Sequence, residues 1–360
     1  MVLYIGLMVV TVALSYFVNN RTAAQLNSVS RQQMVNRLCM TCIFLLLFLV
    51  SACRINVGND YGEYLEIFQD IHKGNHVSTE PGFNAVVLAV QFLFGTGQVS
   101  ALIIFGIFAF ATVYFMLKAM YDQSEWFVYT FFLFMAQGLY FSSMTTVRYY
   151  FVLSIALYSM KYAMQKRWLP FLLWIVFAAF FHKSVLFVLP VYFIASMRWK
   201  KWHILLGGGL CVTFVLFREQ YRRLIFLFYP FYENSPFDNG ETSLMSIVKC
   251  AGGLALAFLY YKYAIKDKRE NSFYFHLNLM ALLLYVFGSF MPEISRICYY
   301  LSVSNIILVP SVLKSIPKKK QKLFFGTVVA ICFLLYFLLY LRGADDVAIR
   351  LLPYKSWLFL

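Results

Sequence analysis

Three single arginines beside apolar segments are the residues of this chain best suited to bind phosphate. Arg54, Arg148 and Arg296 each stand at the end of a different apolar run, whereas the basic residues that anchor membrane helices usually form clusters. A guanidinium keeps its proton, and its planar fork binds two phosphate oxygens at once. Single arginines at the ends of three different apolar runs therefore predict a set of cations that holds pyrophosphate without a metal. The alternative for Arg296 is a local pair with Glu293, three residues earlier.

Three other residues are candidates for a general base, which takes the proton from an attacking hydroxyl and typically accelerates such reactions by about 10²–10⁴-fold. They are Glu80, Asp60 and His182. Each has a structural alternative. Glu80 precedes Pro81 in the pattern of a helix start, Asp60 suits a helix N-cap, and His182 lies in a short turn that could simply reach the membrane surface.

Aromatic and basic side chains near these residues are candidates for contacts with sugar or lipid. The basic residues at 218, 222 and 223, followed by an apolar and aromatic stretch, predict an interfacial segment that covers a lipid substrate or only lies on the outer leaflet. The candidates for sugar or lipid contact are Tyr61, Tyr64, Lys183, Arg218, Arg222 and Tyr299.

Metal and disulfide chemistry are disfavoured. His72 and His76 lie near four acids, but Gly74 interrupts the helix that would present both imidazoles together. Cys39 and Cys42 form a CxxC motif without a second pair, and all seven cysteines lie in or next to apolar runs. We therefore expect no metal and no cofactor.

The composition excludes a water-soluble globular protein. The 360 residues are 61% hydrophobic and only 13% charged, about half the charged share of soluble domains, and the mean hydropathy is +0.69. Continuous apolar runs indicate helices rather than a β-barrel. The expected fold is an all-α, polytopic integral membrane bundle of about twelve spans. The runs are 2–18, 38–53, 100–119, 126–144, 149–164, 169–181, 185–197, 204–217, 244–265, 273–291, 297–313 and 323–341.

A shorter run, 83–94, is either a thirteenth span or a re-entrant helix, and the charge distribution favours re-entry. With re-entry, six loops on one side hold nineteen Lys or Arg against four acids, so nearly all of the net charge of +15 faces the cytoplasm. Both termini are then extracytoplasmic. The N-terminal run lacks a basic start and a cleavage site and is expected to be retained as a span. Because the excess of Lys and Arg lies in loops on one side of the membrane, the net positive charge does not indicate nucleic-acid binding.

We expect a single membrane domain over residues 1–360. Its first outer loop, 54–82, contains a short amphipathic helix from Asp60 onward, and a second outer segment covers 218–243. His182 and Lys183 separate two runs of thirteen residues, each only about 20 Å long as a helix. With a hairpin this short, either the bilayer thins or the turn lies below the outer surface, where ionisable residues are functional candidates.

Five short patterns together resemble the EpsG-like family of bacterial exopolysaccharide and O-antigen polymerases, often called Wzy-type. They are spread in order over residues 54 to 299, about two thirds of the chain. The patterns are Arg54-x3-Gly58-Asn59-Asp60-Tyr61-x2-Tyr64, Glu80-Pro81-Gly82-Phe83, Arg148 at a helix start, His182-Lys183-Ser184 and Arg296-x2-Tyr299.

The resemblance implies a glycosyltransferase at the outer face of the bacterial cytoplasmic membrane. Such an enzyme passes a glycan chain from undecaprenyl pyrophosphate to the terminal sugar hydroxyl of a second lipid-linked repeat unit. Its partners would be these lipid-linked oligosaccharides, together with a chain-length regulator and a flippase.

Two alternatives remain open. Another polyprenyl-dependent glycosyltransferase or an O-antigen ligase would use the same arginines but usually has a larger outer loop. A transporter of lipid-linked sugar should line a path through the bilayer with polar residues, and charge in the middle of the predicted spans is nearly absent apart from Lys249.

Overall fold

The computed structural model describes residues 1–19, 31–228, 230, 233 and 242–359, and this part of the chain is helical. Within it, extended backbone pairing is limited to an isolated antiparallel bridge between Arg54 and Ser356. The predicted all-α class is confirmed. The first basic loop and the 218–243 segment each include residues outside the described part, namely 20–30, 229, 231–232 and 234–241.

Contacts divide the chain into two compact units. The first contains Met1–Lys161, Leu169–Leu186 and Pro317–Leu360, and the second contains Tyr162–Trp168 and Phe187–Ile316. The single domain expected from the sequence remains a prediction.

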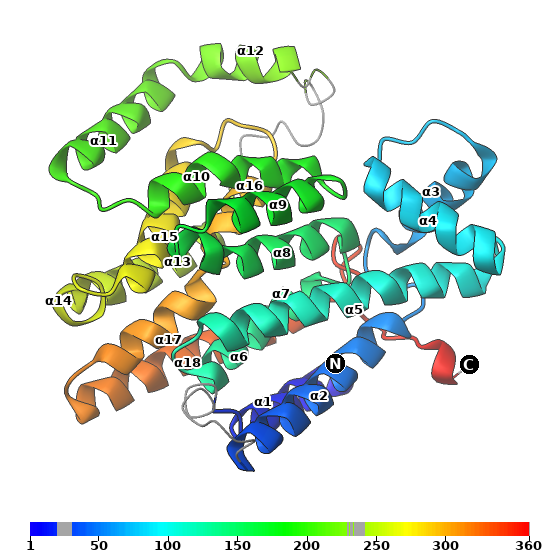
Figure 1. Ribbon diagram of the computed structural model, residues 1–360, viewed down its shortest axis with the longest axis horizontal. Helices are drawn as coiled ribbons and strands as arrows, with labels where there is room; N and C mark the ends of the chain where they lie inside the picture. The colour runs from blue at the N-terminus through cyan, green and yellow to red at the C-terminus, as the bar shows by residue number, and fades with distance from the viewer. Residues whose placement is uncertain (20–30, 229, 231–232, 234–241, 360) are drawn as a thin grey trace. The chain divides into compact units, whose positions relative to one another are not determined.

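The first unit contains both ends of the chain (Figure 1). Helix α2 packs along α5, α1 packs on α2 and α6, and α3 packs on α4 beside the N-terminal half of α5. Its helices are α1 (Val2–Ser15), α2 (Arg31–Ala52), α3 (Tyr61–Lys73), α4 (Pro81–Phe94), α5 (Gln98–Gln123), α6 (Phe127–Ala136), α7 (Leu139–Ser142), most of α8 (Val147–Met164), α9 (Trp168–Ala179) and α18 (Lys319–Arg342).

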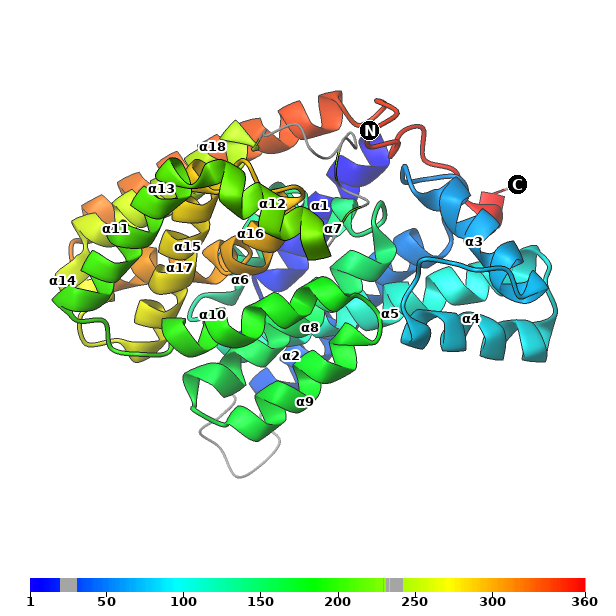
Figure 2. The same ribbon diagram turned by 90° about the horizontal axis from the view of Figure 1, so that it is seen from above.

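The C-terminal segment of the first unit runs beside the start of α3 (Figure 2). The backbone N–H of Ile55 donates to the Lys355 carbonyl at 2.9 Å, and that of Gly58 donates to the Arg350 carbonyl at 2.8 Å. The C-terminal residues therefore hold the loop between α2 and α3 in place.

The second unit is built around α15, which packs on α10, α11, α13, α16 and α17. Its core contains an amide chain: Asn305 donates to Asn278 at 3.2 Å, and Asn278 donates to Ser304 at 2.8 Å. Such bonds link helices where lipid offers no competing partner. The helices are α10 (Val188–Ala195), α11 (Lys201–Leu216), α12 (Arg218–Phe228), α13 (Leu244–Leu259), α14 (Tyr261–Ala264), α15 (Arg269–Phe287), α16 (Ile294–Ser302) and α17 (Asn305–Ser315).

In the described part of the chain, four helical segments are long and apolar enough to cross a membrane: α2, α5, the segment Ile294–Ser315 and α18. A fifth results if α11 and α12, which meet at a bend of 85°, count as one span. Six shorter apolar helices have 10–17 residues. The chain therefore contains several candidate membrane spans, while the count of twelve and the outward orientation of both termini remain predictions.

One expected span, 126–144, is interrupted in the structure. Helix α6 ends at Ala136 and α7 begins at Leu139. Between them Gly138 has φ of 75°, a left-handed conformation that breaks a helix and that glycine adopts without strain. A Cβ at this position would lie 3.2 Å from the ring of Tyr340. Hydropathy alone does not reveal this break, because glycine does not interrupt an apolar run.

The segment expected to form a short amphipathic helix from Asp60 onward is helix α3 in the structure. It begins after Asp60 and buries Tyr61, Tyr64, Phe68 and Ile71, the spacing of one helix face. Its C-terminal cap is Gly74, with φ of 73°. The following short run is helix α4, which begins at Pro81.

Candidate active site

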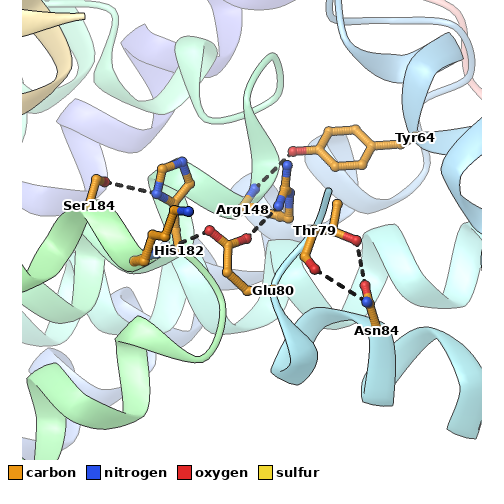
Figure 3. Close-up of polar contacts among 8 residues, drawn as sticks. Tyr64, Thr79, Glu80, Asn84, Arg148, His182 and Ser184 are labelled. Atoms are coloured by element: carbon orange, nitrogen blue, oxygen red, sulfur yellow. Dashed lines mark hydrogen bonds and ion pairs between the residues drawn. The ribbon is translucent and has the colours of Figure 1, made fainter. Parts of the chain in front are cut away.

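A carboxylate and a guanidinium from distant parts of the chain meet in the first unit (Figure 3). Glu80 stands at the N-cap of α4, and its Oε2 accepts a hydrogen bond from Nη1 of Arg148, near the start of α8, at 2.6 Å. The side chains are 13% and 20% exposed. The ion pair is therefore partly shielded from water yet still open on one side.

Aromatic rings fix the position of Arg148. Its guanidinium carbon lies 5.2 Å from the ring centre of Phe83 and 6.0 Å from that of Tyr64, in cation–π contact. The Tyr64 hydroxyl accepts a hydrogen bond from the Arg148 backbone N–H at 3.2 Å. Burial raises the pKa of Tyr64, with Arg148 offsetting part of the effect, so the phenol stays neutral. The Nε of Arg148 is buried without a hydrogen-bond partner among the described residues.

The other oxygen of Glu80 ties α4 to the turn after α9. Its Oε1 accepts the backbone N–H of Lys183 at 3.1 Å. Two residues beyond Glu80, the N–H of Gly82 donates to the Phe180 carbonyl at 2.8 Å. A Cβ on Gly82 would lie only 2.7 Å from that carbonyl oxygen. Glycine therefore allows the approach that brings Glu80 to residues 182–184.

We expect Gly82→Ala to reduce polysaccharide synthesis at least tenfold, because the added methyl group pushes α4 away from the turn and displaces Glu80. Glycan gels of complemented cells give the measurement. The matched control is Gly6→Ala, since a Cβ on Gly6 of α1 meets nothing within 4 Å. If cells with Gly82→Ala make glycan chains as long as cells with Gly6→Ala do, the close approach of Gly82 to Phe180 is not needed for polysaccharide synthesis.

His182 belongs to the same turn after α9 as Lys183, and its side chain lies beside Glu80 (Figure 3). Its Nδ1 and the Ser184 hydroxyl are 2.8 Å apart, and its ring packs edge-on against Tyr149 at 5.8 Å. The structure thus brings together Glu80, Arg148 and His182, three of the residues singled out in the sequence. The side chain of Lys183 is exposed, and its backbone N–H supplies the contact with Glu80.

Arg54 lies in a different environment from Arg148. It is 1% exposed and donates to the carbonyls of Ser51, Val57 and Met144, the last two at 3.2 and 3.3 Å. Burial lowers its pKa, and nearby tyrosines such as Tyr61 oppose this shift. The sequence groups Arg54 with the phosphate ligands, but in this structure its guanidinium is committed to backbone carbonyls and offers no open face. The sequence does not reveal these long-range contacts.

We expect Arg54→Met to lower the amount of folded protein in the membrane. Three carbonyls would lose a charged donor, and each buried group left unsatisfied costs about 1–3 kcal/mol. Thermal unfolding of the detergent-purified protein, followed by size-exclusion chromatography, measures the effect. A variant that is as stable as wild type but inactive would instead support a phosphate-binding role for Arg54.

The other first-loop candidates are structural in large part. Asp60 is half-buried at the N-cap of α3, without a side-chain capping bond. Tyr61 is 5% exposed and stacks on Phe105 with ring centres 4.7 Å apart. Tyr64, at 4% exposure, contacts Arg148 rather than open solvent. A sugar would therefore meet only the edges of these rings.

The second unit contains the remaining candidates. Nε of Arg296 pairs with Glu293 at 2.8 Å, the local alternative considered from the sequence, and the arginine remains 42% exposed. Arg222 pairs with Glu219 at 3.8 Å on α12. Arg218 is exposed and Tyr299 is half-buried. The structure confirms the local pairing of Arg296 and leaves its proposed role in phosphate binding as a prediction.

Among the described residues, no group of three or more His, Cys, Asp or Glu side chains could hold a metal. His72 and His76 are both exposed and flank the cap at Gly74.

The helical fold with several candidate spans indicates a multi-pass membrane protein. The sequence model of the EpsG family matches residues 37–356, nearly the whole chain. The chain belongs to the EpsG family, a family of exopolysaccharide and O-antigen polymerase-like proteins. No curated protein and no solved structure matches it.

Proposed function

We propose that the chain polymerises polysaccharide at the outer face of the bacterial cytoplasmic membrane. The glycan chain on undecaprenyl pyrophosphate is transferred to the terminal sugar hydroxyl of a lipid-linked repeat unit. The observation that carries the proposal is the meeting of Glu80 and Arg148 beside the 182–184 turn in a chain of the EpsG family.

The donor pyrophosphate binds Arg148. This arginine has a buried Nε without a partner among the described residues, and its guanidinium is held against Phe83. An arginine fork stabilises the negative charge that develops on the leaving pyrophosphate and does so without a metal. Arg296 is a second candidate for this role.

Glu80 acts as the general base. When the guanidinium of Arg148 turns toward pyrophosphate, Oε2 of Glu80 becomes free to accept a proton. The acceptor hydroxyl gives its proton to this oxygen while its own oxygen bonds to the anomeric carbon. The bond from that carbon to the pyrophosphate oxygen breaks, and undecaprenyl pyrophosphate leaves. His182 and Asp60 are the alternative bases.

Complementation of a deletion strain tests the function. Cells that lack their own copy should display single repeat units on the surface but no long chains, and the wild-type gene should restore the glycan ladder. If the deletion cells display no single repeat units on their surface, the chain is a transporter and the polymerase proposal is wrong.

A further inference from the structure

A cavity of about 540 Å³ lies between α3, α4 and the start of α5, all within the first unit. This volume is within the usual range of small-molecule sites. The cavity is separate from the Glu80–Arg148 pair, whose two residues do not line it. It shares the elements that carry the pair, because α4 begins beside Glu80 and α3 contributes Tyr64.

A buried amide in this cavity lacks one of its hydrogen bonds. Gln91 is 8% exposed, and its Nε2 donates to the Phe68 carbonyl at 2.8 Å. Its Oε1 is buried and has no partner among the described residues. Leaving such an acceptor unsatisfied costs free energy, so each instance calls for an explanation. Gln91 lines the cavity, so a rotation of its amide toward the cavity would let a ligand hydroxyl donate the missing bond.

The lining matches the surface of a sugar. Amide side chains offer a donor and an acceptor together, as hydroxyl groups require, and Asn56, Gln69, Gln91 and Gln98 all line the cavity. The lining residues include no carboxylate but two basic side chains, His72 and Lys73, which can donate hydrogen bonds to sugar oxygens. Tyr61 and Phe68 also line the cavity, and the exposed edges of their rings supply apolar surface for the C–H groups of a sugar.

The cavity also lies at the right place along α4. Gln91 is ten residues beyond Pro81, about 15 Å along the helix axis, a distance that a short oligosaccharide spans. Next to the lining residues Thr96 and Gly97, Phe92 and Val99 are 89% and 61% exposed. Exposed apolar groups at this rim would face lipid in a membrane. A saccharide in the cavity would thus extend from the lipid surface toward Glu80.

We propose that this cavity binds the saccharide of the acceptor, the lipid-linked repeat unit whose terminal hydroxyl reacts at Glu80. The inference rests on the proposed function and adds a binding site for the acceptor's inner sugars. Gln91 supplies the buried acceptor for a sugar hydroxyl, and the face of α3 around Gly62 leaves the space for the sugar rings.

Two variants test the site, each with a matched control. Gln91→Leu removes the acceptor, and Gly62→Leu places a larger side chain at a position of α3 that lines the cavity, where a Cβ meets nothing within 4 Å. The controls are Gln137→Leu, another buried glutamine with an unpartnered side-chain atom, and Gly6→Leu, on an exposed face of α1. Neither control position lines the cavity.

The probe is the free oligosaccharide released by mild acid from the cell's own lipid-linked repeat units. Titration calorimetry on the purified full-length protein should show binding to wild type, to both controls and to Arg148→Ala. Gln91→Leu should bind the oligosaccharide about tenfold more weakly, the loss of one hydrogen bond. Gly62→Leu should bind it at least as weakly, because the added side chain takes up space in the cavity. Cells with either variant should also make fewer long chains.

Two outcomes would overturn the inference while leaving the polymerase function intact. In the first, wild type restores long chains in cells but its purified form does not bind the oligosaccharide. In the second, the cavity variants bind it as tightly as wild type does. Wild-type complementation that yields no long chains would instead overturn the proposed function itself and the acceptor site with it.

Discussion

Arg148→Ala should abolish long polysaccharide chains while single repeat units still reach the cell surface. The variant removes the guanidinium that we propose holds the leaving pyrophosphate, and loss of one such preorganised donor typically costs about 10²–10³-fold in rate. Glycan gels of complemented deletion cells, with membrane abundance measured by immunoblotting, show the effect. Arg148→Lys should recover only part of it, because lysine lacks the bidentate fork.

The control for this substitution is Arg167→Ala. Arg167 also rests against an aromatic ring, with its guanidinium carbon 5.6 Å from the centre of Tyr162, but it belongs to a loop expected on the cytoplasmic side. Its loss should leave chain length unchanged. If Arg148→Ala cells make long chains at normal abundance, Arg148 does not hold the pyrophosphate.

Glu80→Gln should lower polymerisation by about 10²–10⁴-fold, the usual contribution of a general base. The amide keeps the size of the side chain and can still accept the backbone N–H of Lys183, but it cannot take a proton from the acceptor hydroxyl. The rate of chain growth on lipid-linked repeat units in isolated membranes measures the loss.

A purely structural ion pair would give a different pattern, because removal of one partner of a buried pair also destabilises the fold. Removal of both charges, with Glu80→Gln and Arg148→Gln in one protein, separates the two cases, because the amide at position 80 can still accept the backbone N–H of Lys183. A structural pair would regain abundance and activity in this double variant, whereas the proposed roles require it to stay inactive at normal abundance. Asp122→Asn breaks a similar pair, in which Asp122 lies 2.7 Å from Lys161, and should have little effect.

Periodicity and capping rules are local, and the sequence predicts the elements that depend on them. Helix α3 follows from apolar residues spaced along one face after Asp60, and the start of α4 follows from Pro81 after an acid. The local pair of Arg296 and Glu293 is likewise one of the two alternatives that their three-residue spacing allows.

Features that depend on tertiary contact could not be predicted in this way. The burial of Arg54 depends on the Met144 carbonyl, ninety residues away, and the approach of Gly82 depends on Phe180. The sequence also offers no reason to single out Gln91, which stands in an apolar run. The unsatisfied Oε1 of Gln91 becomes apparent only in the folded structure, where residues of α3 and α5 surround this side chain.

The most direct test of the central claim is reconstitution of the purified protein in liposomes with lipid-linked repeat units. We expect wild type alone to form long glycan chains and release undecaprenyl pyrophosphate, and Arg148→Ala and Glu80→Gln to form neither product in appreciable amount. If both variants polymerise at the wild-type rate, or if folded wild type only moves the lipid-linked sugar across the bilayer, the Glu80–Arg148 pair is not the site of glycan transfer.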